Sequence, residues 1–433
     1  MLSPASFMRC DMNKIFALAD CNNFYCSCER VFAPSLRNKP VIVLSNNDGC
    51  VIARSNEVKA IGIAMGEPVF KCQGLIQKHK VQVFSGNFPL YGDMSGRMMS
   101  TLSQFSPNLD VYSIDEAFLS LDGFENQNLF EYAKKIHKTV RRDTGLPISI
   151  GVASTKTLAK IANRIAKKST ADGVFCLLDQ QHIDTCLENT AVENVWGIGS
   201  NKSEVLKRHG IQNALQLKLA PDSWIKKNLT VVSLKTVWEL RGISCLPLEE
   251  VVPDKKAIGV SRTFGHDTHS LKELQEAVSA YIARAAEKLR SQNSVCGHIQ
   301  VYIATNPFKG PMKYSNAISM DLTPPTAYTP RLIEVAGDLL KRIYRSEFVY
   351  KRAGVLLTSL EAESSAQEFL FDEPYQDSRR QQLMRVMDRH NSNTNFGKMF
   401  WAAEGVTKPW FMKQTHKSPK YTTRWSELLT VKA

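Results

Sequence analysis

The chain of 433 residues lacks the features that mark several common classes of protein. It has no run of about 18 uncharged apolar residues, so we expect no membrane-spanning helix. No basic segment precedes a long apolar stretch near its start, so residues 1–13 do not read as a secretory signal. We expect these residues to be a leader to the fold, with Met12 as an alternative start. A hydrophobic content of 43% excludes a mainly disordered chain.

Paired metal-ligand motifs are also missing. The ten cysteines are scattered and include no Cys-x-x-Cys pair, and the nine histidines include no His-x-x-x-His pair. Zinc sites commonly use such pairs. We therefore expect reduced, mostly buried thiols, as in a cytoplasmic protein, in place of zinc sites or disulfides.

Acidic residues are outnumbered. The chain has 55 Lys and Arg against 42 Asp and Glu, which gives a net charge of +13. The excess is concentrated: residues 131–168 hold ten basic and two acidic side chains, and residues 255–360 hold fifteen and eight. This pattern favours a polyanionic partner, with nucleic acid ahead of an anionic membrane. Ordinary solubility is the alternative, but it requires no clustering of charge.

Strands and helices alternate in the first 186 residues. Apolar runs predict strands, and apolar residues at helical spacing predict two helices. The expected strands are 15–20, 110–113, 117–121, 148–153 and 174–178, and the expected helices are 130–140 and 158–165. Residues 26–84, which are rich in proline and glycine, interrupt this pattern as an irregular insertion. The order resembles a ferredoxin-like domain with an inserted subdomain.

The remaining residues divide into a helical part, a second α/β part and a tail. Gly197 and Gly199 form a Gly-x-Gly turn between helical segments, and Lys202 follows it. Glycine amides can approach a phosphate closely, so this turn is a candidate contact to a DNA backbone, although a plain turn is the commoner meaning. Residues 256–359 predict a β-α-β-β-α-β unit that includes Arg262. The last 60 or so residues show little periodicity.

Three acidic residues lie at predicted strand ends. Asp20 ends the first strand, and Asp115 and Glu116 lie between two short strands. Carboxylates gathered at one sheet can hold two divalent cations for phosphoryl transfer, and magnesium prefers such oxygen ligands. Neighbouring residues of a flat strand face opposite ways, so Asp115 and Glu116 can act together only at a bend. A polar turn is the alternative interpretation.

The order of several motifs resembles the Y-family, or translesion, DNA polymerases. The first motif is DCNNFYCSCE at residues 20–29, the second is YSIDEAF at residues 112–118, and the third is GVASTKTLAKIAN at residues 151–163. VIVLSNNDGCVIA at residues 41–53 and SPKYTTR at residues 418–424 are similar to the UmuC branch of that family.

The resemblance implies an α+β multidomain fold with a ferredoxin-like palm, small inserted fingers, a helix-hairpin-helix thumb and a β-α-β-β-α-β little finger. The expected parts are a leader at 1–13, the palm at 14–26 and 85–186, the fingers at 27–84, the thumb at 187–252, the little finger at 253–360 and a tail at 361–433.

The resemblance also implies roles for individual residues. Asp20, Asp115 and Glu116 match the catalytic ligands of two Mg²⁺ ions, and Cys21 matches a ligand through its backbone carbonyl. Tyr25, beside Phe24, matches the steric gate whose ring excludes a ribose 2′-hydroxyl. A core tyrosine is the alternative.

Further nucleotide contacts are expected from two basic positions. Lys160 matches a lysine that reaches the triphosphate, although without the motif a solvated helix face is the commoner setting. The fingers read Asn56-Glu57-Val58-Lys59 where many family members have Tyr-Glu-Ala-Arg. Lys59 keeps the charge of that arginine but loses its bidentate geometry. Asn56 can still donate a hydrogen bond.

The tail contains QEFLF, in which Gln367, Leu370 and Phe371 resemble a peptide that binds the β sliding clamp. Glu368 departs from the apolar residue usual at the second position. The UmuC likeness implies two further partners, a dimer of a processed UmuD-like subunit and a RecA-type recombinase filament. We expect both to dock on the tail.

The implied activity is error-prone, template-directed DNA synthesis across lesions in the SOS response of a bacterium. The substrates would be primer-template DNA and deoxynucleoside triphosphates (dNTPs), and the location would be the cytoplasm, at the nucleoid, with no membrane partner. Two alternatives remain. One is a non-catalytic DNA- or clamp-binding adaptor on the same fold, although carboxylates without metal would repel DNA. The other is a nucleotide cyclase, against which the helix-hairpin-helix and basic little-finger features argue.

Overall fold

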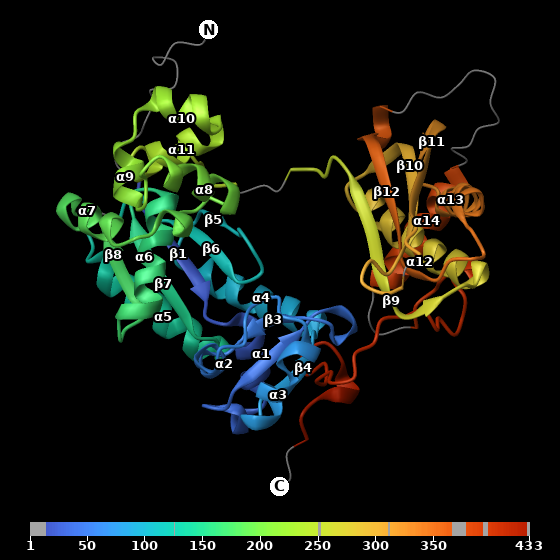
Figure 1. Ribbon diagram of the computed structural model, residues 1–433, viewed down its shortest axis with the longest axis horizontal. Coiled ribbons are helices and arrows are strands. Elements are labelled where there is room, and N and C mark those ends of the chain that lie inside the picture. The colour runs from blue at the N-terminus through green and yellow to red at the C-terminus, as the bar shows by residue number, and fades with distance from the viewer. Residues whose placement is uncertain are drawn as a thin grey trace. The chain divides into compact units, whose positions relative to one another are not determined.

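The computed structural model describes residues 14–124, 126–249, 253–310, 312–365, 378–392 and 397–430 (Figure 1). These residues form two compact units. The first contains the described residues up to 45, residues 50–249 and residues 416–430, and the second contains residues 46–49 and the described residues from 253 to 415. Within the described ranges, every helix is too short or too polar to span a bilayer.

A five-stranded sheet organises the first unit. Its order is β5 (Leu109–Asp110), β6 (Glu116–Ser120), β1 (Phe16–Cys21), β7 (Ile148–Ala153) and β8 (Val174–Leu177). The central strand β1 is antiparallel to both β6 and β7, and β7 is parallel to β8. The strand expected at 110–113 ends at residue 110, because residues 113–115 form a bend.

The alternation of β1 divides this sheet between two helical layers. Ala17 and Ala19 belong to the core shared with α4 (Phe88–Leu102) and α5 (Leu129–Thr144). Phe16 and Leu18 belong to the opposite core, which they share with α6 (Lys156–Ser169). Since alternate residues of a strand share a face, Asp20 falls on the α6 side of the sheet.

The insertion in the first unit is more regular than the sequence suggests. It contains a three-stranded sheet with the order β3 (Val51–Arg54), β2 (Val41–Leu44) and β4 (Gln82–Ser85). The helices around it are α1 (Phe24–Phe32), α2 (Asn56–Ile61) and α3 (Val69–Lys78), and the insertion has a small core of its own.

A helical part follows β8 and packs against α6. It consists of α7 (Gln180–Glu188), α8 (Ser200–Arg208), α9 (Ala214–Leu219), α10 (Asp222–Asn228) and α11 (Val231–Leu240). Apolar residues of α7, α8, α9 and α11 share one core with α6 and the sheet. The position of α6 therefore depends on this helical part as well as on the five-stranded sheet.

Buried polar contacts fix the N-terminal end of α6. Glu239 of α11 is fully buried, and its carboxylate accepts hydrogen bonds from the backbone N–H of Thr157 at 3.0 Å and of Cys245 at 2.7 Å. Lys156 forms a buried ion pair with Asp110 at 2.6 Å. A buried charge is tolerated when it is paired and hydrogen-bonded, as here. These contacts hold the helix that lines the site described below.

The second unit has a four-stranded antiparallel sheet with the order β11 (Ser315–Thr326), β10 (Ser294–Thr305), β12 (Tyr350–Ala362) and β9 (Ile258–Thr268). Helices α12 (Leu271–Ser291) and α13 (Thr329–Ile343) share its core. The chain order is the expected β-α-β-β-α-β.

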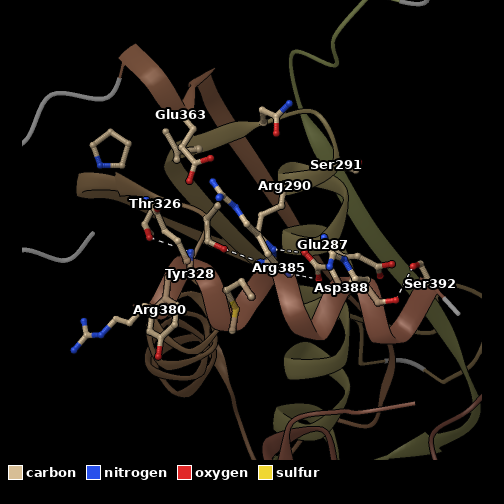
Figure 2. Close-up of a pocket in the computed structure, with 17 residues that line it drawn as sticks. Glu287, Arg290, Ser291, Thr326, Tyr328, Glu363, Arg380, Arg385, Asp388 and Ser392 are labelled. Atoms are coloured by element: carbon tan, nitrogen blue, oxygen red, sulfur yellow. Dashed lines mark hydrogen bonds and ion pairs between the residues drawn. The ribbon is translucent and has the colours of Figure 1, made fainter. Parts of the chain in front are cut away.

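Residues after β12 divide between the two units. A helix that periodicity did not predict, α14 (Ser378–Ser392), belongs to the second unit, and residues 416–430 belong to the first. Figure 2 shows Asp388 of α14 beside Arg290 of α12, where the two side chains form a bidentate pair at 2.6 and 2.8 Å. Met384, which is 2% exposed, also lines this cavity of about 410 Å³. The ion pair of Asp388 and the buried side chain of Met384 thus help to attach a largely polar helix.

Candidate active site

A cleft of about 1160 Å³ lies in the first unit at the end of β1. Residues from β1, the bend before β6, α1, α2 and α6 line it. Each of the acidic and nucleotide-contacting residues expected from the sequence lies in this lining: Asp20, Cys21, Phe24, Tyr25, Asn56, Lys59, Asp115, Glu116 and Lys160. Segments about 140 residues apart in the sequence therefore meet in one place.

Strand register brings the carboxylates together. Asp20 of β1 is directly opposite Glu116 of β6, and the backbone N–H of Cys21 donates to the carbonyl oxygen of Asp115 at 2.8 Å. Asp115 lies in the bend, and its carboxylate accepts a hydrogen bond from the Ser113 hydroxyl at 2.6 Å. The bend places the adjacent residues Asp115 and Glu116 on the same cleft, which a flat strand could not do.

Two lysines of α6 face the acidic residues. Lys167 Nζ lies 2.6 Å from an oxygen of Asp20, and Lys160 Nζ lies 2.9 Å from both oxygens of Glu116. Lys160 is also 4.3 Å from the centre of the Tyr112 ring, a cation–π contact. The lysines supply the positive charge that these partly buried carboxylates need.

Burial changes the acidity of the Asp20 carboxyl group. It raises the pKa of Asp20 to about 6, although the charge and hydrogen bond of Lys167 lower it. The negative charges of Glu116 and Asp115 raise it further. The carboxyl groups of Asp20, Asp115 and Glu116 therefore lie close enough for their charges to interact, although burial is the larger cause of the raised pKa of Asp20.

The donor set fits magnesium. Three carboxylates and the backbone of Cys21 line the cleft, and hard divalent cations prefer oxygen ligands. Among the residues that the structure describes, no three His, Cys, Asp or Glu side chains come close enough to form a ready-made metal site. Two of the three carboxylates are instead paired with lysines, so binding of a cation would require them to exchange partners.

An aromatic layer forms the wall at α1. The rings of Tyr25 and Tyr91 stack with centroids 4.4 Å apart and planes 17° apart, and Phe88 packs edge-on against both. Phe24 is buried at 4% exposure, whereas Tyr25 is only partly buried and reaches the cleft. The Tyr25 ring therefore forms part of the cleft wall, and the stacked ring of Tyr91 supports it.

The side of the cleft at the insertion is basic. Lys59 Nζ donates to the side-chain oxygen of Asn23 at 2.6 Å, and Asn23 donates to the side-chain oxygen of Asn56 at 3.0 Å. Burial and the neighbouring charges of Arg54 and Lys167 lower the pKa of Lys59. An anion between these groups would relieve their mutual repulsion.

Family models match most of the chain. The impB/mucB/samB family matches residues 19–164, and the C-terminal domain of that family matches residues 255–370. The chain belongs to the impB/mucB/samB family. A third match, over residues 381–431, is to a domain of unknown function (DUF4113).

Relatives and solved structures agree with this membership. Protein UmuC of Salmonella typhimurium is 43% identical over 96% of this chain and 100% of its own length. DNA polymerase IV of Dehalococcoides mccartyi is 30% identical over 66% of this chain and 72% of its own. The structure of a Y-family DNA polymerase chimera, Dbh-Dpo4(243-245)-Dbh, covers 80% of this chain and 99% of its own, with a TM-score of 0.64 and 22% identity. These findings confirm the expected fold class and the likeness to the UmuC branch.

Four basic residues that line the cleft were not predicted from the sequence. They are Arg164, Lys167 and Lys168 of α6 and Arg54 of β3. Lys167 follows Lys160 by seven residues, which places both on one face of a helix. That spacing could have identified Lys167. Arg54, whose guanidinium donates to the carbonyl oxygen of Ile63 at 2.6 Å, carries no such signal.

The expected DNA contacts lie outside the cleft. Gly197 has a positive φ of 85°, Gly199 precedes α8, and Lys202 Nζ donates to the carbonyl oxygen of Gly197 at 3.2 Å. Arg262 is exposed on β9 of the second unit. The expected clamp-binding residues, Gln367, Leu370 and Phe371, lie outside the described residues.

Proposed function

We propose that this member of the impB/mucB/samB family is a DNA-directed DNA polymerase that copies damaged templates. The observation that carries the proposal is the cleft in which three carboxylates from β1 and the β6 bend face basic side chains from α6 and the fingers. Nucleotidyl transfer needs both groups, because the reaction brings a polyphosphate and a hydroxyl together.

Asp20, Asp115 and Glu116 would hold two Mg²⁺ ions, together with the backbone carbonyl of Cys21. When bound, Mg²⁺ lowers the pKa of the primer 3′-hydroxyl and neutralises charge on the triphosphate. In the overall reaction the 3′-oxygen bonds to the α-phosphorus, the bond to the β-phosphate oxygen breaks, and pyrophosphate leaves.

The basic side chains would bind the triphosphate. Lys160 and Lys167 are held near the acidic residues by ion pairs of 2.9 and 2.6 Å. A triphosphate carries more negative charge than a carboxylate, so it would draw both ammonium groups toward itself. Lys59 and Asn56 line the same cleft and would contact the same phosphates. A lysine contacts phosphate as a point charge, whereas arginine offers two parallel hydrogen bonds.

Tyr25 would select the sugar. Its ring forms part of the cleft wall and is supported by Tyr91, so it cannot withdraw easily from a ribose 2′-hydroxyl. Base choice would rest on pairing with the template, with no side chain reading the base.

The distribution of charge and the likeness to UmuC support further proposals about how the chain binds DNA and which proteins it binds. The basic segments 131–168 and 255–360, with Arg262, would hold the DNA backbone without sequence preference. Gly197, Gly199 and Lys202 would contact the same backbone. We further propose a role in the SOS response, with the β sliding clamp bound by the peptide at 367–371, a processed UmuD-like dimer and a RecA-type filament.

A primer-extension assay tests the proposal. The native chain should insert a dNTP opposite an abasic site with Mg²⁺, in the presence of the clamp, the UmuD-like dimer and the recombinase filament. Lys160→Met and Lys167→Met should each raise KM for dNTP, because each removes a charge that faces the phosphates. Lys227→Met, which removes an exposed lysine of α10 outside the cleft, should leave KM for dNTP unchanged. Tight DNA binding without insertion under every condition would favour the adaptor instead.

A further inference from the structure

Residues 416–430 form the C-terminal segment of the first unit, and residues 416–421 of this segment contact the insertion. The backbone N–H of Ser85, in β4, donates to the carbonyl oxygen of His416 at 3.0 Å, and the N–H of His416 donates to the Ser85 hydroxyl at 3.0 Å. Figure 1 shows this segment, in red, beside β4 and α1. It falls within the match to a domain of unknown function, and the proposed function gives it no role.

Asn87 joins this segment to the beginning of α4. Its side chain is fully buried and makes no capping hydrogen bond to the helix that it precedes. Its amide nitrogen instead lies 3.1 Å from the carbonyl oxygen of Ser418, 2.9 Å from the Ser418 hydroxyl and 3.1 Å from the carbonyl oxygen of Pro419. A residue type that usually caps a helix is thus used to hold the C-terminal segment.

Ser418 also contacts a buried acidic residue of α1. Its hydroxyl, on a residue 7% exposed, donates to one carboxylate oxygen of Glu29 at 3.0 Å. The Tyr91 hydroxyl donates to the same oxygen at 2.7 Å. Glu29 is 1% exposed, and burial raises its pKa, although these two hydrogen bonds lower it. A carboxylate this buried depends on its donors.

These contacts extend to the aromatic wall of the cleft. Tyr91, which is held through its hydroxyl by Glu29, stacks on Tyr25 with ring centroids 4.4 Å apart. Tyr421 stacks on Phe32 with centroids 4.7 Å apart and planes 12° apart. Since Tyr25 and Phe32 lie at opposite ends of α1, the C-terminal segment acts on both ends of the helix that carries the candidate sugar-selecting ring.

We propose that residues 416–421 are a positioning element for sugar selection. Ser418 orients Glu29, Glu29 orients Tyr91, and the Tyr91 ring fixes the depth at which Tyr25 enters the cleft. Ser418 and Asn87 are positioning residues, because neither touches the cleft. This inference rests on the proposed function, because sugar selection can be measured only if the chain makes DNA. The hydrogen bonds and ring contacts on which it is based do not depend on that function.

Ser418→Ala in the full chain tests the proposal, with Ser426→Ala as the matched control. Ser426 is an exposed serine of the same segment. The measurement is kcat/KM for insertion of a dNTP relative to the matching ribonucleotide. Ser418→Ala removes two hydrogen bonds of the hydroxyl, one donated to Glu29 and one accepted from Asn87, and should lower this ratio by about threefold to tenfold. Ser426→Ala should leave the ratio unchanged. An unchanged ratio in Ser418→Ala, with a normally folded protein, would overturn the proposal.

Tyr91→Phe provides a second route if Ser418→Ala fails to fold. It removes the hydroxyl bound to Glu29 but keeps the ring stacked on Tyr25, so a purely steric role of the ring would leave the ratio unchanged. The proposal requires the ratio to fall in this variant too. A change in overall stability alone would not move this ratio.

Amide hydrogen exchange separates this inference from the proposed function. Exchange in residues 24–32 and 88–92 should be faster in Ser418→Ala, or in Tyr91→Phe where the serine variant does not fold, than in Ser426→Ala, without any nucleotide present. A native chain that makes no DNA, combined with faster exchange, would refute the polymerase and support the positioning contacts. Equal exchange in the tested variant and the control would overturn the positioning role whether or not DNA is made.

Discussion

Replacing Gly151 by alanine should displace α6 from the five-stranded sheet. Gly151 lies in β7, and an added Cβ would lie 2.7 Å from the backbone carbon of Ala162, and closer still to the backbone of Asn163 and Ala159. Ordinary contact begins at 3.4 Å, so α6 must move by at least about 0.7 Å. Backbone atoms cannot rotate away as a flexible side chain could.

The displacement should weaken both folding and chemistry. Overpacking of this kind costs about 1–3 kcal/mol in the free energy of unfolding. Because α6 carries Lys160 and Lys167, a shift approaching 1 Å should lower kcat/KM for dNTP insertion by about 100-fold. Chemical denaturation measures the first quantity, and single-nucleotide insertion measures the second.

The control for Gly151→Ala is Gly96→Ala. Gly96 lies on the exposed side of α4, and a Cβ there meets no atom within 4 Å. That change should stabilise the helix by about 0.5–1 kcal/mol and leave insertion unaltered. If Gly151→Ala behaved like Gly96→Ala in both assays, the tight contact between β7 and α6 would not exist as described.

Three further outcomes are expected. Glu239→Ala should lower the free energy of unfolding by about 3 kcal/mol, because it leaves the buried N–H of Thr157 and the partly buried N–H of Cys245 without an acceptor. Asp388→Asn should speed amide exchange across α14, because it weakens the pair with Arg290 that attaches this helix. Glu29→Gln should gain stability relative to the native chain as the pH rises above 4.5, since burial raises the pKa of Glu29 and ionisation therefore costs the folded state more than the unfolded one.

Two of these predictions have a control variant, and the third has a result that would contradict it. Glu204→Ala, which removes an exposed pair with Arg208, should stay within about 0.5 kcal/mol of the native chain. Asp338→Asn, which loses only an exposed contact to Lys341, should leave exchange in α14 as it was. For Glu29, a stability difference that is flat between pH 4 and pH 8 in urea titrations would contradict the raised pKa.

Much of the five-stranded sheet of the first unit could be predicted from the sequence pattern. The apolar run at 15–20 predicted a strand ending near Asp20, and the alternation of side chains along a strand explains why Asp20 and Phe16 share the α6 side of the sheet. The adjacency of Asp115 and Glu116 required a bend, and a bend is present at residues 113–115. Local pattern was sufficient because each of these features depends on neighbours in the sequence.

Long-range and polar features could not be predicted in this way. Helix α14 has no strong apolar face, so its periodicity was too weak to indicate a helix. The contact of Ser418 with Glu29 joins residues 389 positions apart and involves no charge pattern. The pairing of Lys167 with Asp20 depends on how α6 lies across the sheet, which the spacing of either residue alone does not define.

The most direct test of the central claim is primer extension by Asp115→Asn/Glu116→Gln. Its control is Glu131→Gln/Asp143→Asn, which removes the same charge from exposed positions of α5. We predict that the first variant loses insertion opposite an abasic site while its affinity for primer-template DNA holds or rises, and that the control retains both. Insertion by the first variant at the rate of the control would contradict the assignment of the carboxylates to nucleotidyl transfer.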